Sequence, residues 1–142
     1  MRKAFVAVIA TMLLLALTAC SSDESTGGGE SNRVAVTLDD FSIDPAPTSV
    51  PAGPVTFEVE NVGPAVHEMV VIRSDIDPAE IPVENHEADE EAPGMTPIGE
   101  VEDVQVGEST ELKLTLETGS YVLLCNIKKH FERGMVTEFQ VT

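Results

Sequence analysis

Residues 123–135 read LLCNIKKHFERGM, and this stretch carries three side chains that can bind a soft metal ion. Cys125, His130 and Met135 are spaced as Cys-x4-His-x4-Met, just before the last apolar run of the chain. A second histidine, His67, stands far upstream at the start of another apolar run. Two imidazoles, one thiolate and a weak thioether are the donors of an electron-transfer copper site, and few other sites use this combination.

The apolar residues around this stretch follow the period of two that is typical of half-buried β-strands. The alternating runs lie at residues 34–38, 55–59, 112–116 and 135–141. Denser apolar runs, suited to the middle of a sheet, lie at residues 69–72 and 121–124 and place Met69 and Tyr121 in the core. Turn-forming residues separate the runs, and no long window has helical periodicity. Many short strands at this spacing predict an all-β sandwich.

The segment 75–99 breaks the strand pattern, because it is rich in proline and acidic residues. We expect a long loop here, which is uncommon in a small domain. Residues 77–80 (DPAE) supply an N-cap, a proline at N1 and an acid at N3, so a short helical turn can begin there. Residues 84–91 (ENHEADEE) are expected to form a solvated bulge, with His86 at the surface.

The N-terminal residues have the features of an export and anchoring signal. Residues 1–19 begin with two basic residues and continue as an apolar run that is short for a membrane-spanning helix. Residues 17–20 (LTAC) resemble the lipobox of bacterial lipoproteins, which implies cleavage before Cys20 and lipidation of its sulfur. An ordinary secretory signal is the alternative. If Cys20 is lipidated, residues 20–32 form a flexible linker that holds the domain, residues 33–142, roughly 20 Å from its anchor.

The cysteine count supports a metal site. With Cys20 lipidated, Cys125 is the only other cysteine, so no intramolecular disulfide can form. An unpaired cysteine in an exported protein needs an explanation, and metal ligation supplies one. A buried and inert thiol is the alternative.

The charge of the chain excludes some partners. The full sequence has a formal net charge of −17. Removal of the signal residues leaves 6 basic residues against 25 acidic ones, a net charge of −19. A domain this acidic is not expected to bind nucleic acid or to adsorb directly to anionic lipid, so its contact with a membrane would be through the lipid anchor only.

The donors occur in the order His67, Cys125, His130, Met135, with Asn61-Val62-Gly63 ahead of the first and Gly134 directly before the last. This arrangement over residues 33–142 resembles the cupredoxins, the family of small blue copper proteins. The resemblance implies a Greek-key β-sandwich that binds one copper ion per chain, cycling between Cu(II) and Cu(I). It also implies that the four donors are the copper ligands, and that electrons leave through His130.

The sequence departs from this family in two places. Lys128 and Lys129 stand where related loops often have Pro-Gly, and with Arg133 they make up half of the 6 basic residues of the processed chain. This cluster predicts a docking patch for an acidic partner; three solvated loop residues without a partner are the alternative. Glu68 stands where many cupredoxins have an asparagine that ties the ligand loops together, and it can accept a hydrogen bond but adds charge.

The sequence therefore predicts a membrane-tethered type 1 copper protein that carries single electrons between redox proteins, a respiratory complex being one candidate. We expect a monomer, lipid-anchored to the cell membrane and facing the extracytoplasmic side (periplasm or cell surface), and not an enzyme. A lipoprotein for copper storage, delivery or sensing is the main alternative. A hydrolase that uses Cys125 with a histidine base, and a sandwich that only binds other proteins, are further alternatives.

Overall fold

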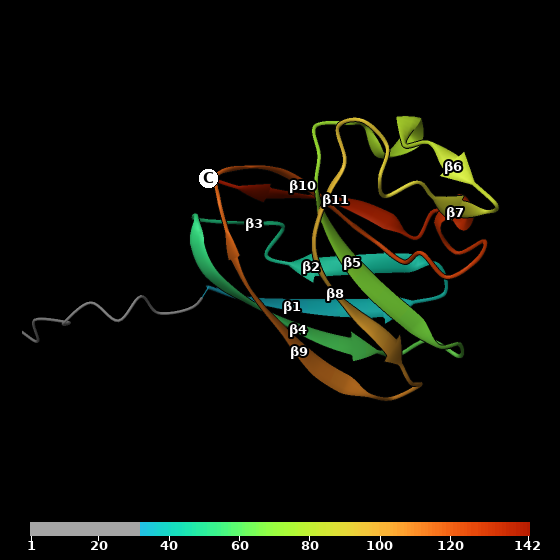
Figure 1. Cartoon of the computed structure of the whole chain (residues 1–142). Helices are drawn as coiled ribbons and strands as arrows, with labels where there is room; N and C mark the ends of the chain where they lie inside the picture. The colour runs from blue at the N-terminus through green and yellow to red at the C-terminus, as the bar shows by residue number, and fades with distance from the viewer. Residues whose placement is uncertain (1–31) are drawn as a thin grey trace, which may run out of the picture.

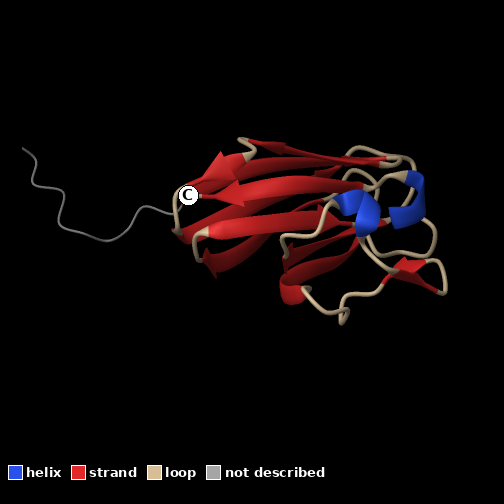
Figure 2. Cartoon of the chain, turned by 90° about the horizontal axis from the view of Figure 1, so that it is seen from above, coloured by secondary structure: helices blue, strands red, loops and turns tan. Residues whose placement is uncertain are grey.

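The computed structural model describes residues 32–142, which form two stacked β-sheets (Figures 1 and 2). One sheet has the order β2-β1-β4-β9 and consists of β1 (Asn32–Asp39), β2 (Ser42–Ala46), β4 (Gly53–Asn61) and β9 (Ser109–Leu116). The other has the order β3-β11-β10-β5-β8 and consists of β3 (Ser49–Val50), β5 (His67–Arg73), β8 (Thr96–Val104), β10 (Gly119–Leu124) and β11 (Val136–Val141). The predicted all-β sandwich is confirmed.

The predicted signal peptide, the lipidation at Cys20 and nearly all of the linker fall outside the described residues. Within residues 32–142, no helix has both the length and the apolar character that crossing a membrane requires.

The main core lies between the two sheets and is built by the alternating residues. Every second side chain of β1 is buried, and β4 follows the same alternation except that Thr56 is buried as well. The two strands run parallel, with Val36 opposite Val59. The rings of Phe57 on β4 and Phe139 on β11 meet edge to face at 5.4 Å between centroids, so they join the two layers. Tyr121 is 2% exposed in this core, and its hydroxyl donates to the Glu117 carbonyl at 2.8 Å.

A second apolar cluster explains the dense runs on β5 and β10. Val70 and Ile72 on β5, with Val122 and Leu124 on β10, are buried on the face of the sheet that points away from the main core. The proline-rich segment covers this face with its own apolar residues, Ile81, Ala88, Ala92 and Met95. Both faces of these central strands are therefore buried, as their composition predicts.

The predicted helical turn is present as the 3-10 helix η1 (Pro78–Glu80), in which the Asp77 side chain accepts a hydrogen bond from the Ala79 N–H at 2.9 Å. The predicted solvated bulge is wrong. Residues 84–91 contribute to a hairpin of β6 (Val83–Glu84) and β7 (Glu87–Ala88), with Ala88 only 5% exposed. We call residues 83–91 the acidic hairpin. Its tip is exposed, but its second strand packs into the second apolar cluster.

The loops that carry the candidate ligands gather at one end of the sandwich. Figure 2 shows the acidic hairpin and the two short helical turns, η1 and η2 (Phe131–Arg133), at the end opposite the C-terminus. β5 and β10 are hydrogen-bonded neighbours in antiparallel orientation, so the start of β5 lies beside the end of β10. This pairing brings His67 to the loop that follows β10.

Candidate metal centre

Three of the four predicted ligands meet at this end of the sandwich. His67 is the first residue of β5, Cys125 directly follows β10, and His130 lies at the N-cap of η2. The Nδ1 atoms of the two histidines are 3.2 Å apart, and the Cys125 Sγ lies 3.4 Å from the His130 Nδ1. One donor atom from each residue lies within 4.8 Å of the other two. The geometry is thus that of a three-donor metal site.

The site is closed on one side and open on the other. His67 and Cys125 are both 0% exposed, whereas His130 is partly exposed. The His130 ring is packed edge to face against the ring of Phe41, with centroids 5.1 Å apart, and the guanidinium of Arg133 lies 4.6 Å from the centroid of the same Phe41 ring. His130 is therefore the histidine nearer to solvent, as the resemblance to the cupredoxins implies.

The loop from Cys125 to Met135, here called the ligand loop, is folded by its own backbone. The Cys125 N–H donates to the Met135 carbonyl at 3.0 Å, and the Met135 N–H donates to the His130 carbonyl at 3.2 Å. Gly134 has a φ of +98° and donates to the Phe131 carbonyl at 2.8 Å. This left-handed residue ends η2 and returns the chain to β11, and it explains why glycine precedes the methionine.

Met135 is 0% exposed, and its backbone is bonded to two other candidate ligands. It lies in the main apolar core together with Cys125. A thioether is a weak, soft donor that suits the axial position of a copper site. The role of Met135 as the fourth ligand stays a prediction.

The chemistry of the donors fits copper. Burial raises the pKa of the Cys125 thiol, and the charge of Glu68 adds to this, against the lowering effect of hydrogen bonds with backbone N–H groups. Burial lowers the pKa of His130, and the neighbouring His67 and Arg133 lower it further, against the opposite effect of Asp40. A neutral imidazole has a lone pair for a metal, and a metal displaces the thiol proton. Zinc fits less well, because a thioether is not among its usual ligands.

Two residues of the β1–β2 turn contact the candidate ligands, and the sequence analysis missed both. The Asp40 carboxylate lies 3.0 Å from the Nε2 of His67, and Phe41 packs on His130. Both residues lie far upstream in the chain, in a turn whose sequence has no metal-binding pattern. No local signal in the sequence indicates these contacts.

Glu68 ties the two ligand segments together, as an asparagine does in many cupredoxins. Its Oε1 accepts a hydrogen bond from the Asn126 N–H at 2.8 Å. Burial raises the pKa of the Glu68 carboxyl most, while the bond from Asn126 lowers it. The nearby carboxylates of Glu100, Glu90 and Glu102 raise it further. The added charge thus lies in a cluster of acids beside the ligand loop.

The acidic hairpin also holds the ligand loop. The Asn126 side chain accepts from the Ala88 N–H at 2.6 Å and donates to the Ala88 carbonyl at 3.1 Å and to the Glu90 carboxylate at 2.6 Å. At the hairpin tip, the His86 carbonyl accepts from the Lys129 N–H at 2.8 Å. These bonds restrain a loop that has Lys-Lys in place of Pro-Gly.

The three basic residues of the predicted docking patch, Lys128, Lys129 and Arg133, are exposed on the ligand loop. In residues 32–142, the other three cations form ion pairs with carboxylates: Arg33, Arg73 and Lys113. None of the three patch residues has such an ion pair within this part of the chain. No carboxylate within the described residues therefore neutralises these three charges by an ion pair.

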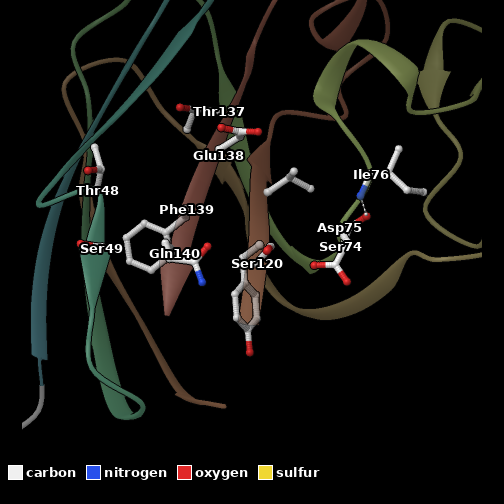
Figure 3. Close-up of a pocket in the computed structure, with 12 residues that line it drawn as sticks. Thr48, Ser49, Ser74, Asp75, Ile76, Ser120, Thr137, Glu138, Phe139 and Gln140 are labelled. Atoms are coloured by element: carbon white, nitrogen blue, oxygen red, sulfur yellow. Dashed lines mark hydrogen bonds between the residues drawn. The ribbon is translucent and has the colours of Figure 1, made fainter. Parts of the chain in front are cut away.

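The domain also has a groove of about 480 Å³, and Figure 3 shows the residues that line it. Residues 48–49, 74–76, 120–122 and 137–140 line it. None of the predicted site residues is among them, so the groove is separate from the candidate ligands.

Comparison with known proteins gives the family. The family model of the cupredoxin-like domain matches residues 7–137. No match was found among curated protein sequences.

Several solved structures are similar to this chain at low sequence identity. Reduced auracyanin from the photosynthetic bacterium Roseiflexus castenholzii is 19% identical, with a TM-score of 0.60 over 80% of this chain and 99% of that one. Auracyanin A, a "blue" copper protein from Chloroflexus aurantiacus, is 16% identical, with a TM-score of 0.57 over 80% of this chain and 100% of that one. Reduced rusticyanin is 19% identical, with a TM-score of 0.54 over 82% of each chain. These structures share the fold, and the family match spans most of the sequence: the chain belongs to the cupredoxin-like domain family.

Proposed function

We propose that this protein is a membrane-tethered type 1 copper protein that carries single electrons between redox partners outside the cytoplasmic membrane. The main support is that the Cys125 Sγ and the Nδ1 atoms of His67 and His130 lie close together, in a site closed to solvent on one side. A fold shared with a blue copper protein adds support. The proposed role is that of a carrier and not of an enzyme.

The residues of this chain supply a rigid and largely dry site. A bound copper ion supplies one-electron chemistry by cycling between Cu(II) and Cu(I). His67 and Cys125 come from the ends of two paired central strands, and the ligand loop is restrained by hydrogen bonds to Glu68 and the acidic hairpin. Donors that are fixed in this way move little between the two oxidation states. His130, the partly exposed ligand, offers the shortest route for an electron to solvent.

The membrane anchor is supported by the sequence alone. Cys20 follows a lipobox-like stretch, and a linker rich in serine, glycine and acidic residues separates it from the domain. A tether of this kind lets the copper end of the domain reach partners near the membrane surface. The acidic body of the domain would not adsorb to anionic lipid by itself.

We expect the copper-loaded protein to pass reversibly through repeated cycles of one-electron reduction and oxidation without losing copper. A closed, cysteine-centred site releases its ion slowly in either oxidation state. The measurement is copper content and visible absorption after repeated cycles in the presence of a chelator. Rapid transfer of copper to the chelator would instead support a role in copper storage or delivery.

The exposed cations of the ligand loop are the proposed contact for an acidic redox partner. They lie within three residues of the partly exposed His130 in the ligand loop, so a partner bound there would lie close to the ion. Long-range attraction by such a patch raises association rates by about 10- to 1,000-fold at low salt. The partner itself is a redox protein, a respiratory complex being one candidate.

A double charge reversal tests this patch. Lys128→Glu with Lys129→Glu is expected to slow oxidation of the reduced protein by the anion ferricyanide about tenfold or more at low ionic strength. The difference should shrink as added salt screens the charges, which happens over about 10 Å at 0.1 M. The measurement is the stopped-flow rate as a function of salt concentration.

The matched control reverses two cations elsewhere on the domain. Arg33 on β1 and Lys113 on β9 form ion pairs in the four-stranded sheet, and their change to glutamate alters the net charge by the same amount. A smaller effect is expected from this pair. An equal effect would mean that total charge, and not the patch, determines the rate.

A further inference from the structure

The two nitrogens of His67 have different partners. Its Nδ1 points into the candidate metal site, 3.2 Å from the Nδ1 of His130. Its Nε2 points away from the site and lies 3.0 Å from the Oδ1 of Asp40. His67 is fully buried, while the Asp40 side chain is 29% exposed. The carboxylate therefore reaches from the surface to a ligand that solvent does not contact.

Hydrogen bonds in the turn and at the end of β1 position Asp40. It lies in the turn between β1 and β2, and its N–H donates to the Oδ1 of Asp39 at 2.8 Å. The last part of β1 is bonded to the turn after β4, because the Val62 N–H donates to the Leu38 carbonyl at 2.9 Å. The turn that carries Asp40 and the segment that leads to His67 are thus joined directly.

Gly63 leaves the space that this contact needs. A Cβ atom at this position would lie 3.0 Å from the Nε2 of His67 and 3.2 Å from both the Cα and the Oδ1 of Asp39. Contacts this short are rare, so a larger residue would push against the His67 ring and against Asp39, the residue directly before Asp40. The lack of space at position 63 is independent of the hydrogen bond, and it also indicates that His67 lies close to the turn after β1.

We propose that Asp40 is a positioning residue for the metal site, which holds His67 by accepting a hydrogen bond from its Nε2–H. An imidazole that donates from Nε2 has its lone pair on Nδ1, the atom that faces Cys125 and His130. The carboxylate also places a negative charge one ring away from the metal. This charge favours Cu(II) over Cu(I), so it lowers the reduction potential. The inference rests on the proposed copper function, but its first test does not.

The first test uses the copper-free protein. Nitrogen-15 NMR of the histidine rings is expected to show His67 as a single tautomer with the proton on Nε2. In Asp40→Leu, which has a similar size and no acceptor, this preference should be lost. Amide spectra of the same sample show whether the variant is folded. Absence of the Nε2–H tautomer in the wild-type protein, or its full retention in folded Asp40→Leu, would overturn the proposal.

The second test measures the effect of the charge. Asp40→Asn keeps an oxygen acceptor and the shape of the side chain, so it is the variant expected to fold if the leucine variant does not. We expect its Cu(II) affinity to fall about 10- to 100-fold, the usual effect of losing a partner of a metal ligand. Its Cu(I) affinity should fall less. Each tenfold change in the ratio of the two affinities raises the reduction potential by about 59 mV.

The control for this test is Asp44→Asn. Asp44 is exposed on β2, three residues after Phe41, and its carboxylate accepts from the hydroxyl of Ser42. The substitution removes the same charge without touching His67, so the potential should stay close to that of the wild type. A shift equal to that of Asp40→Asn, or no shift in Asp40→Asn, would refute the proposed role. A wild-type protein with no blue copper site would refute the proposed function instead, and the NMR result would still decide the tautomer.

Discussion

Cys125→Ser is expected to abolish the intense visible absorption of the Cu(II)-loaded protein. That absorption in a blue copper site depends on a thiolate bound to the ion, and Cys125 supplies the only thiol within the described residues 32–142. A serine hydroxyl is not ionised at neutral pH, and it cannot replace a soft thiolate in a site of this kind. The measurement is the visible and electron paramagnetic resonance spectrum of each protein after loading with copper.

Alanine substitutions of the three histidines provide the comparison for this experiment. His67→Ala and His130→Ala should each perturb the blue spectrum, because each removes a nitrogen donor from the site. His86→Ala should not, because the His86 side chain is 57% exposed and pairs with Glu132 at 3.0 Å. Loss of the colour in His86→Ala alone, or a blue spectrum in Cys125→Ser, would show that the ligand set is wrong.

The ligand loop could be predicted from sequence because its chemistry is local. Cys125, His130 and Met135 lie within eleven consecutive residues, and the fold needs only to close one loop between two strands. His67 could be found because it begins a strand after a turn, and central strands of this composition pair with one another. Alternation of apolar residues likewise predicted the sandwich, since it depends only on which face of each strand is buried.

The contacts made by Asp40 and Phe41 could not be predicted in the same way. They arise from the parallel pairing of β1 with β4, which sets Leu38 opposite Asn61 and brings the turn after β1 to the metal end. Nothing in the residues of the turn specifies that pairing. The acidic hairpin differs from the predicted solvated bulge for a related reason. Its charges are conspicuous in sequence, whereas the burial of Ala88 depends on an apolar face supplied by β5 and β10.

Copper affinity is expected to rise about tenfold for each unit of pH between about pH 7 and 8.5, and to go on rising above that range. Burial raises the pKa of Cys125, so the thiol stays protonated in the copper-free protein and the metal must displace its proton. Burial lowers the pKa of His130, so this imidazole is already neutral and adds no second proton. An exposed thiol would be ionised at about pH 8.5, and the rise would stop there.

The measurement is anaerobic competition for Cu(I) with a chromophoric chelator, corrected for proton binding by the chelator itself. Cys125→Ser removes the group that exchanges the proton, so its weaker copper affinity should lose most of the pH dependence. An affinity of the wild-type protein that levels off at pH 8.5 would contradict a raised thiol pKa.

The Cys125 thiol should also make the stability of the copper-free protein fall as the pH rises, whereas the copper affinity rises. Because its pKa is raised in the folded state, its contribution to stability is fully present below the pKa of the unfolded chain and declines as the pH rises above it. The free energy of unfolding should then fall by up to about 1.4 kcal/mol per pH unit above about pH 8.5, relative to Cys125→Ser. Copper loading replaces the thiol proton with a metal bond, so this loss should disappear in the loaded protein. The measurement is urea unfolding of the wild-type protein and of Cys125→Ser, each with and without copper, as a function of pH. Identical pH profiles of the two copper-free proteins would show that Cys125 ionises as readily in the folded domain as in the unfolded chain.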